Sequence, residues 1–425
     1  MRLLAEKKVA GIALPVYVLL TAAVLTAMWL GWLPDSMIGA LLVMMTLGGL
    51  FHFLGENIPV LSTHLGGGTI VCIFGAAALT RAGLIPGGML HTIDGFLNQT
   101  GFLDFFIASL IAGSMLSMNR RLLIRSAVRF LPVAFMSMGA GIIAVLLFGK
   151  LFGYEMRETL MFIAIPMMSG GMGAGVVPLS GMYAEAMHVE TAEVMSRLMP
   201  ASAVGNVSAI LMAGILAGIG NRFPKLTGNG WLLRGEKNWD SEKKSSDLQI
   251  DRLLTGLVLS LIFYLGGVYL NRFLPVIHTY AWMILLTAGA RAAGIIPEPL
   301  AEGAGQWSSL VIRCFTNAVL IGIGSVLIDL DAMSAAISPS WLMLVIIITV
   351  AVTLGAAEGG YAVGFYPIES AITAGLCTIN MGGSGNIAIL SASKRMELLA
   401  FAQLATRICG SLVLVLSSIL IRVFL

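Results

Sequence analysis

Long apolar stretches separated by short polar segments run through almost the whole chain. A helix needs about 20 consecutive apolar residues to cross a bilayer. By this measure the pattern predicts eleven crossings, near residues 10–33, 36–55, 68–86, 102–118, 127–149, 195–219, 252–271, 274–296, 307–329, 339–357 and 398–421. The chain is therefore predicted to be an all-α polytopic membrane protein.

Composition excludes several other classes of protein. Hydrophobic residues make up 58% of the 425 positions and charged residues 11%, whereas an average soluble domain has roughly 25% charged residues. The net charge of +3 provides no basic surface that would attract nucleic acid. The four cysteines form no CxxC pair, and the crossings contain no HExxH or GxSxG motif. We expect neither a resident cofactor nor an enzyme.

Basic residues predict the orientation of the chain, because short cytoplasmic loops are enriched in Lys and Arg. Arg2, Lys7 and Lys8 precede the first crossing, an arginine cluster at 120–129 follows four crossings later, and the polar segment 221–251 follows two crossings after that. Even numbers of crossings separate the clusters. We therefore expect a plasma (inner) membrane protein with the N-terminus in the cytoplasm and the C-terminus outside.

Two glycine-rich segments, 162–180 and 370–386, fit an ordinary crossing poorly. A glycine inside a helix costs roughly 1 kcal/mol relative to alanine, and irregular backbone at membrane depth is tolerated only where protein or a cavity surrounds it. We expect both segments to enter the membrane, break and return on the same side. Their GGxG cores contain Gly170, Gly171 and Gly173, and Gly382, Gly383 and Gly385.

The two GGxG cores lie half the chain length apart. Five predicted crossings separate equivalent elements, and this odd number gives the two halves opposite orientations. An inverted-topology repeat with paired broken segments is the best sequence indication of a secondary transporter with a binding site near the membrane midplane.

Arg407 lies about ten residues into the last predicted crossing. A central arginine costs roughly 2.5–3.5 kcal/mol on insertion scales, so it should face a cavity or a partner. Its planar fork suits a carboxylate, and no acidic residue in the predicted crossings lies at comparable depth. We interpret Arg407 as a ligand of an anionic substrate; the alternative is a structural arginine that binds helix-end carbonyls.

The broken segments also favour ion binding. Unwound turns and helix N-termini offer N–H groups to a carboxylate. Their carbonyls, with the side chains of Ser169, Asn380 and Ser384, could coordinate a small hard cation. Glu369, just ahead of the second core, either binds a proton or a cation or is an acid at the cytoplasmic surface.

Several of these motifs resemble the 2-hydroxycarboxylate transporter family. They are Gly170–Ser180, Ala374–Cys377, Asn380–Gly385, Ser391–Met396 and Ala405–Gly410. The resemblance implies a homodimer in which a mobile transport part moves like an elevator against a static scaffold and carries citrate, malate or a related acid with Na+ or H+. It also implies that Arg407 contacts the substrate, that the Gly173 and Asn380–Ser384 turns help to form the substrate and ion sites, and that Cys377 lies near one ion.

Together, these arguments give two sets of candidate residues. The substrate-binding set is Arg407, Gly171, Met172, Gly173, Met381, Gly382, Gly383 and Ser384. The ion-binding set is Met167, Ser169, Cys377, Asn380, Ser384 and Glu369. The predicted scaffold covers 10–118 and 252–330, the transport part 119–220 and 336–425, and a solvated cytoplasmic linker 221–251, for which a regulatory contact site is the alternative.

Three departures bear on the substrate. Citrate-carrying members tend to have Asn and Arg where this chain has Met172 and Met381, and Asn386 occupies a position where Asp is common. The loss of a cationic contact favours a smaller dicarboxylate such as malate over citrate. The choice between Na+ and H+ stays open. An exchanger, for example of malate for lactate, is the alternative mechanism, and a passive anion channel ranks below both because the crossings show only isolated polar residues.

Overall fold

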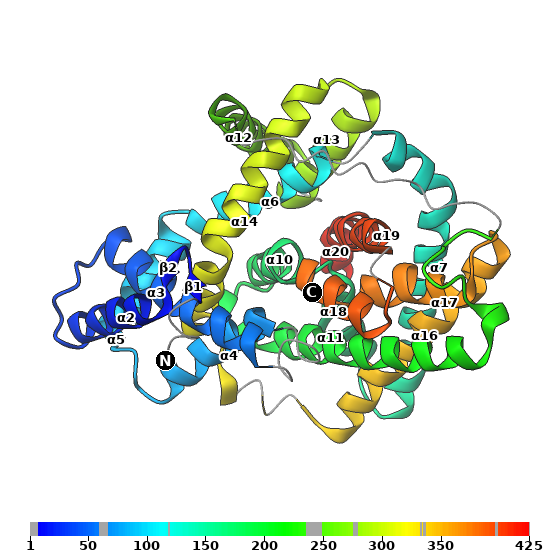
Figure 1. Cartoon of the computed structure of the whole chain (residues 1–425), viewed down its shortest axis with the longest axis horizontal. Helices are drawn as coiled ribbons and strands as arrows, with labels where there is room; N and C mark the ends of the chain where they lie inside the picture. The colour runs from blue at the N-terminus through cyan, green and yellow to red at the C-terminus, as the bar shows by residue number, and fades with distance from the viewer. Residues whose placement is uncertain are drawn as a thin grey trace. The chain divides into compact units, whose positions relative to one another are not determined.

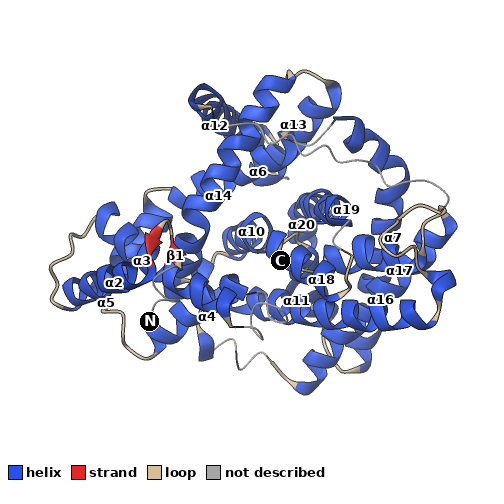
Figure 2. Ribbon diagram, viewed as in Figure 1, coloured by secondary structure: helices blue, strands red, loops and turns tan. Residues whose placement is uncertain are grey.

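The computed structural model of the chain describes residues 7–58, 67–117, 120–234, 249–274, 279–331, 334, 337–395 and 398–424. Within these ranges the ordered structure is almost entirely helical, with one small antiparallel strand pair (Figure 2). The all-α prediction is therefore confirmed apart from this pair.

The elements follow in chain order. The first group is β1 (Lys8–Val9), β2 (Ile12–Ala13), α2 (Leu14–Trp29), α3 (Met37–Asn57), α4 (Gly67–Arg81), α5 (Gly87–Asp94) and α6 (Phe102–Leu116). The second is α7 (Arg120–Leu151), α8 (Met156–Thr159), α9 (Ile165–Met168), α10 (Val177–Met187) and α11 (Thr191–Arg222). The third is α12 (Ile250–Phe273), α13 (Thr279–Ala293), α14 (Glu298–Val326), α16 (Pro339–Ala362), α17 (Pro367–Ser370), α18 (Gly383–Ala392), α19 (Leu399–Leu404) and α20 (Gly410–Phe424).

Wider π-helical turns interrupt or extend several of these helices. They cover Gly95–Gln99, Leu160–Ala164, Met172–Val176, Ala371–Gly375 and Ala405–Cys409. Short 3-10 helices cover Pro224–Leu226 and Leu376–Thr378. Such π-helical turns occur frequently at functional sites, and four of the five lie in or beside the two glycine-rich segments and the Arg407 turn.

Seven helices within the described residues are long and apolar enough to cross a bilayer. They are Met37–Asn57, Arg129–Leu151, Thr191–Arg222, Ile250–Phe273, Glu298–Val326, Pro339–Ala362 and Phe401–Phe424. An eighth span results if Gly87–Gln99 and Phe102–Gly113, which meet at a 47° bend, form one crossing. Seven or eight spans are thus supported, and the predicted number of eleven is not established, because α2, α4 and α13 have only 16, 15 and 15 residues.

The start of the first predicted crossing was wrong. Residues 8–13 form the β1–β2 hairpin, and the helix begins only at Leu14. The two residues between the strands, Ala10 and Gly11, have φ values of 50° and 83°. A two-residue turn with positive φ at both positions matches the twist of a hairpin. Residues with positive φ cannot be part of a right-handed helix, which has negative φ throughout.

Contacts divide the chain into two compact units. The first contains residues 1–106 and 310–334, and the second contains residues 107–309 and 335–425. The whole predicted transport part falls in the second unit, whereas the residues assigned to the scaffold are divided between both. The functional division into scaffold and transport parts stays a prediction.

In the second unit, α7 and α16 pack along one another (Figure 1). Small residues allow the close approach: a Cβ atom on Gly355 would lie 2.8 Å from the Cβ of Ala140. The Ser137 hydroxyl donates a hydrogen bond of 2.9 Å to the carbonyl of Val352. The π-helical turn Ala371–Gly375 packs against α16, so this helix pair supports the second glycine-rich segment.

The described part of the predicted linker is only partly solvated: residues 221–226 are exposed, as expected, but some later residues are not. Leu232 and Leu233 are buried, and Leu233 forms an isolated antiparallel bridge with Phe365. The amide of Tyr366 donates to the Leu232 carbonyl at 2.9 Å. Burial of these two leucines favours docking on the turn before α17, which sequence composition could not reveal. Residues 235–248 of the linker lie outside the described ranges.

Candidate functional site

Each glycine-rich segment forms two helical arms joined by an irregular turn. The first arm of the first segment begins just ahead of residue 162, at α8, and continues through α9 to Gly170 and Gly171, which have φ values of 87° and 110°. In the second, α17 and the two short helices after it lead to Gly382, with φ of 96°. L-residues with a side chain rarely adopt these conformations. The helices therefore end at the glycines of the two cores, whereas the re-entrant course of the two segments stays a prediction.

The two turns lie against each other. A Cβ atom on Gly171 would be 2.7 Å from the Cα of Gly382, and one on Gly170 would be 2.6 Å from the carbonyl oxygen of Thr406. Neither position has room for a side chain. The first turn is therefore in backbone contact both with the second turn and with the segment that contains Arg407.

Arg407 lies in the π-helical turn Ala405–Cys409, inside the membrane-spanning segment Phe401–Phe424. Its side chain is half-buried. The turn follows α19 and precedes α20. A π-helical turn displaces its residues from the regular helical register. The residue before Arg407, Thr406, contacts the first glycine turn through its carbonyl oxygen.

A cluster of polar groups lies behind the second turn. The Asn380 side chain donates to Asn386 Oδ1 at 2.6 Å and accepts from the Gly382 amide at 2.8 Å. The Thr406 hydroxyl lies 3.0 Å from both Asn386 Oδ1 and the Cys377 carbonyl. All of these groups are buried. They join the second turn to the Arg407 helix through neutral oxygen and nitrogen atoms.

The remaining predicted residues are distributed as follows. Met172 and Met381 are buried, with 2% and 5% exposure, at the first and second turn. Met167 lies beside Gly205 of α11, since a Cβ atom there would be 3.0 Å from the Met167 Cε. Ser169 Oγ donates to the Pro166 carbonyl at 3.0 Å.

The other members of the predicted sets add less. Gly173 is partly exposed in the turn Met172–Val176. Gly383 begins α18, and the side chain of Ser384 lies outside what the structure describes. Within the described residues, no group of three or more His, Cys, Asp or Glu could hold a metal ion.

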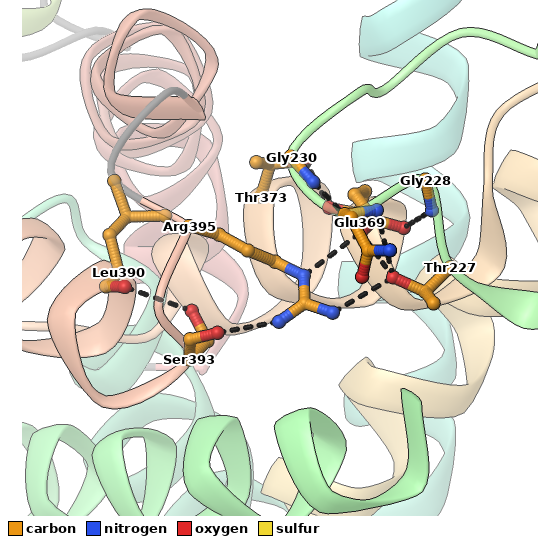
Figure 3. Close-up of polar contacts among 9 residues, drawn as sticks. Thr227, Gly228, Gly230, Glu369, Thr373, Leu390, Ser393 and Arg395 are labelled. Carbon is orange, nitrogen blue, oxygen red and sulfur yellow. Dashed lines mark hydrogen bonds and ion pairs between the residues drawn. The ribbon is translucent and has the colours of Figure 1, made fainter. Parts of the chain in front are cut away.

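Glu369 is not an acid at the surface, and Figure 3 shows the polar groups around it. Its side chain is 0% exposed and forms an ion pair of 2.9 Å with Arg395, which is itself buried. Thr227 Oγ1 donates to the carboxylate at 2.6 Å, and the amides of Gly228 and Gly230 donate at 2.9 and 3.4 Å. The surface interpretation was therefore wrong, because the docked linker covers this carboxylate.

The guanidinium nitrogens of Arg395 also have hydrogen-bond partners. Its guanidinium donates to Glu369 through Nε, to the Ser393 carbonyl and to Thr227 Oγ1 (Figure 3). Arg395 follows α18, the second arm, and Glu369 belongs to α17, the first arm. The ion pair therefore connects the two arms of the second segment at the end opposite its glycine turn.

Sequence reasoning missed Asn206 and Thr227. Asn206 Oδ1 accepts a hydrogen bond of 3.2 Å from the amide of Met381 at the second turn. It is a polar residue well inside the predicted crossing 195–219, so the depth argument used for Arg407 could have found it. Thr227 gave no such signal, because its contact with Glu369 depends on how the linker docks.

A side chain at Gly171 should separate the two turns. We expect Gly171→Ala to reduce transport roughly tenfold or more, because the new Cβ atom would meet Gly382 at 2.7 Å and the backbone φ of 110° disfavours alanine. The measurement is substrate uptake by reconstituted protein. Gly181→Ala on α10 is the matched control, since a Cβ atom there meets nothing within 4 Å. Equal uptake by both variants would contradict the importance of this contact.

The chain combines helices long enough to span a membrane with two broken segments and a half-buried arginine beside them. This combination is typical of a membrane transport protein. The model of the 2-hydroxycarboxylate transporter family matches residues 9–419. The chain therefore belongs to this family, and it is a transporter and not an enzyme.

Individual relatives agree with this assignment. The chain is 40% identical over 428 residues to the malate transporter MleP of Lactococcus lactis, with both chains covered completely. It is 38% identical to the citrate transporter CitP of Lactococcus lactis, over 97% of this chain and 93% of that protein. It is 33% identical to the citrate/sodium symporter of Salmonella typhimurium, over 97% of this chain and 94% of that protein.

Proposed function

We propose that this chain is a secondary active transporter that moves a 2-hydroxycarboxylate of the malate or citrate type, with malate favoured, together with Na+ or H+. The observation that carries the proposal is the meeting of three interrupted segments: the Gly170–Gly171 turn, the Gly382 turn and the Arg407 turn. Interrupted helices present N–H groups that have no partner within the helix. Together with one guanidinium group, they suit a small carboxylate.

The residues at the turns support malate over citrate. Met172 and Met381 are buried apolar side chains at the two turns, and Arg407 is the cationic side chain among the predicted substrate ligands. One guanidinium and neutral donors balance the charge of a dicarboxylate better than that of a tricarboxylate. The similarity to a malate transporter over the full length is consistent with this preference.

The polar cluster behind the second turn is the proposed cation site. The Thr406 hydroxyl lies 3.0 Å from the Cys377 carbonyl oxygen and 3.0 Å from Asn386 Oδ1, which brings three oxygen atoms close together. Carbonyl groups of unwound backbone coordinate Na+ in other transporters. Similarity to a citrate/sodium symporter supports Na+ as the coupling ion. We leave Glu369 out of this site, because its carboxylate is fully paired with Arg395, Thr227 and backbone amides.

The internal similarity of the two segments supports an inverted repeat. Each first arm begins with a four-residue α-helical turn and continues with a five-residue π-helical turn: α8 and Leu160–Ala164 in the first, α17 and Ala371–Gly375 in the second. We further propose that both segments are re-entrant, that the N-terminus is cytoplasmic, and that the protein is a homodimer whose transport part, including residues 119–220 and 336–425, moves by an elevator-like mechanism.

Uptake into proteoliposomes tests the proposed function. We expect labelled malate to accumulate when an inward Na+ gradient is imposed at fixed pH, with citrate accumulating less. Accumulation driven only by a pH gradient would replace Na+ with H+. Malate–lactate counterflow without a cation gradient would favour the exchanger, and non-saturating flux down the substrate gradient would favour a channel. Absence of any hydroxy acid transport by well-folded protein would overturn the proposal.

A further inference from the structure

Two buried polar atoms on α11 have no hydrogen-bond partner. Asn206 is 0% exposed and Ser202 is 2% exposed. Neither Asn206 Nδ2 nor Ser202 Oγ reaches a partner within the described residues, and in the second unit they are the only such side-chain atoms that the structure describes. Buried polar groups in native proteins are nearly always paired, so each exception requires an explanation.

The two atoms belong to one site. Residues four apart on a helix lie on the same face, one turn above the other. Asn206 Oδ1 accepts the amide of Met381, and this bond fixes which end of the side chain is oxygen. A Cβ atom on Gly385 would lie 2.6 Å from the same oxygen. The Asn206 amide is thus held against the second glycine turn while its nitrogen remains unused.

The first glycine segment reaches the same part of α11. Gly205 adjoins Met167 of the first arm, and the Ile379 carbonyl of the second segment lies 3.6 Å from the position of a Cβ atom there. α11 also packs against α9, and against α10 and α18 (Figure 1). Ser202 and Asn206 therefore lie where α11 meets both broken segments.

The chemistry of the unpaired atoms identifies the kind of ligand. An amide nitrogen donates two hydrogens and has no lone pair for a cation, and a hydroxyl donates one hydrogen. The serine oxygen could also bind a cation through its lone pairs, but the Asn206 nitrogen could not. An oxygen acceptor therefore satisfies both atoms, whereas Na+ satisfies at most one. We propose that Ser202 Oγ and Asn206 Nδ2 donate hydrogen bonds to a carboxylate oxygen of the transported acid, which makes them specificity-determining residues. This inference rests on the proposed function and extends its substrate site to α11.

Other hydroxyl groups of α11 differ from this pair. Ser208, two residues beyond Asn206, contacts the Gly205 carbonyl at 2.8 Å and the Thr349 hydroxyl at 2.7 Å. Its partners belong to the protein, so its role is to hold α11 against α16. Ser208 therefore provides a matched control on the same helix.

Three variants test the inference. Ser202→Ala removes the unpaired hydroxyl, Asn206→Asp keeps Oδ1 for the Met381 amide but replaces the donor nitrogen with oxygen, and Ser208→Ala removes a paired hydroxyl. The measurements are KM and maximal rate for malate in proteoliposomes at neutral pH, and Tm in detergent. We expect Ser202→Ala to raise KM about tenfold without lowering Tm, and Asn206→Asp to raise it more, because a carboxylate repels the substrate. Ser208→Ala should lower Tm and leave KM unchanged.

A comparison of substrates identifies the group that is bound. If the pair binds the second carboxylate of malate, the rise in KM should be absent for lactate, which has only one. An unchanged malate KM in both Ser202→Ala and Asn206→Asp would overturn the inference and would assign the unpaired atoms to a water molecule. If the Asn206→Asp protein fails to fold, the malate KM of Ser202→Ala alone tests the inference. Lack of hydroxy acid transport by the unaltered protein would instead contradict the proposed function.

Discussion

Replacing Arg407 with lysine is expected to raise the KM for the transported acid about 10- to 100-fold. A hydrogen bond to a charged group contributes roughly 1.5–3 kcal/mol, and each 1.4 kcal/mol corresponds to about a factor of ten. Lysine keeps the positive charge but not the planar fork that binds a carboxylate through two parallel hydrogen bonds. Because the turn Ala405–Cys409 is in contact with the first glycine turn, this loss would fall directly on the proposed substrate site.

Arg313→Lys is the matched control for this experiment. Arg313 is an exposed arginine of α14, which is another helix long enough to span the bilayer. The Arg313→Lys substitution is the same chemical change, but in the first compact unit, whereas the glycine turns belong to the second. We expect KM to be unaffected. Size-exclusion chromatography and Tm measurements establish that both variants are folded. An Arg407→Lys protein with unaltered KM would exclude Arg407 as a substrate ligand and would favour the structural alternative.

Replacing Glu369 with glutamine is expected to destabilise the protein by about 3–5 kcal/mol. Breaking a buried ion pair leaves the remaining charge without a counterion in a medium of low dielectric constant. Here Arg395 would stay buried, with 6% exposure, beside a neutral side chain. The change also weakens the attachment of Thr227 and Gly228, so the docked linker should become more accessible. The measurement is the free energy of unfolding in detergent, with proteolysis of the linker as the second readout.

The first glycine segment offers a matched control for this ion pair. Glu158 of α8 pairs with Arg197 of α11 at 3.7 Å, but the two side chains are 52% and 37% exposed. Exposed pairs contribute about 1 kcal/mol or less, so Glu158→Gln should change stability little. The double variant Glu369→Gln with Arg395→Gln should lose less than the sum of the single changes. Equal, small effects of Glu158→Gln and Glu369→Gln would contradict the importance of burial.

The sequence located the breaks in the helices well. Gly170, Gly171 and Gly382 adopt positive φ values at the two cores, and these conformations follow from the absence of a Cβ atom, which is a local property. Helix-length apolar stretches were equally visible, because hydropathy depends on the residues themselves. Hydropathy along the sequence could not establish a full crossing where the helices are short, as in α2, α4 and α13.

The contact partners of individual side chains could not be predicted from the sequence. Glu369 was predicted either to bind an ion or to lie at the surface, and only the docking of Thr227 and the fold of the second segment gave it Arg395. Burial and pairing of a charge depend on residues far apart in the chain, so no local pattern reports them. The same holds for Asn206, whose partner, Met381, is 175 positions away.

The sequence by itself thus determined the all-α membrane class, the two glycine breaks and the residues that carry the family resemblance. These features follow from residue hydrophobicity and backbone freedom, which act over one or two helical turns. Only the tertiary structure decided that the Gly171 and Gly382 turns touch, that the Arg407 turn contacts the first of them, and that a linker covers Glu369. Those contacts join segments more than a hundred residues apart in the chain. They form only when the helices pack and their small residues allow backbone to approach backbone.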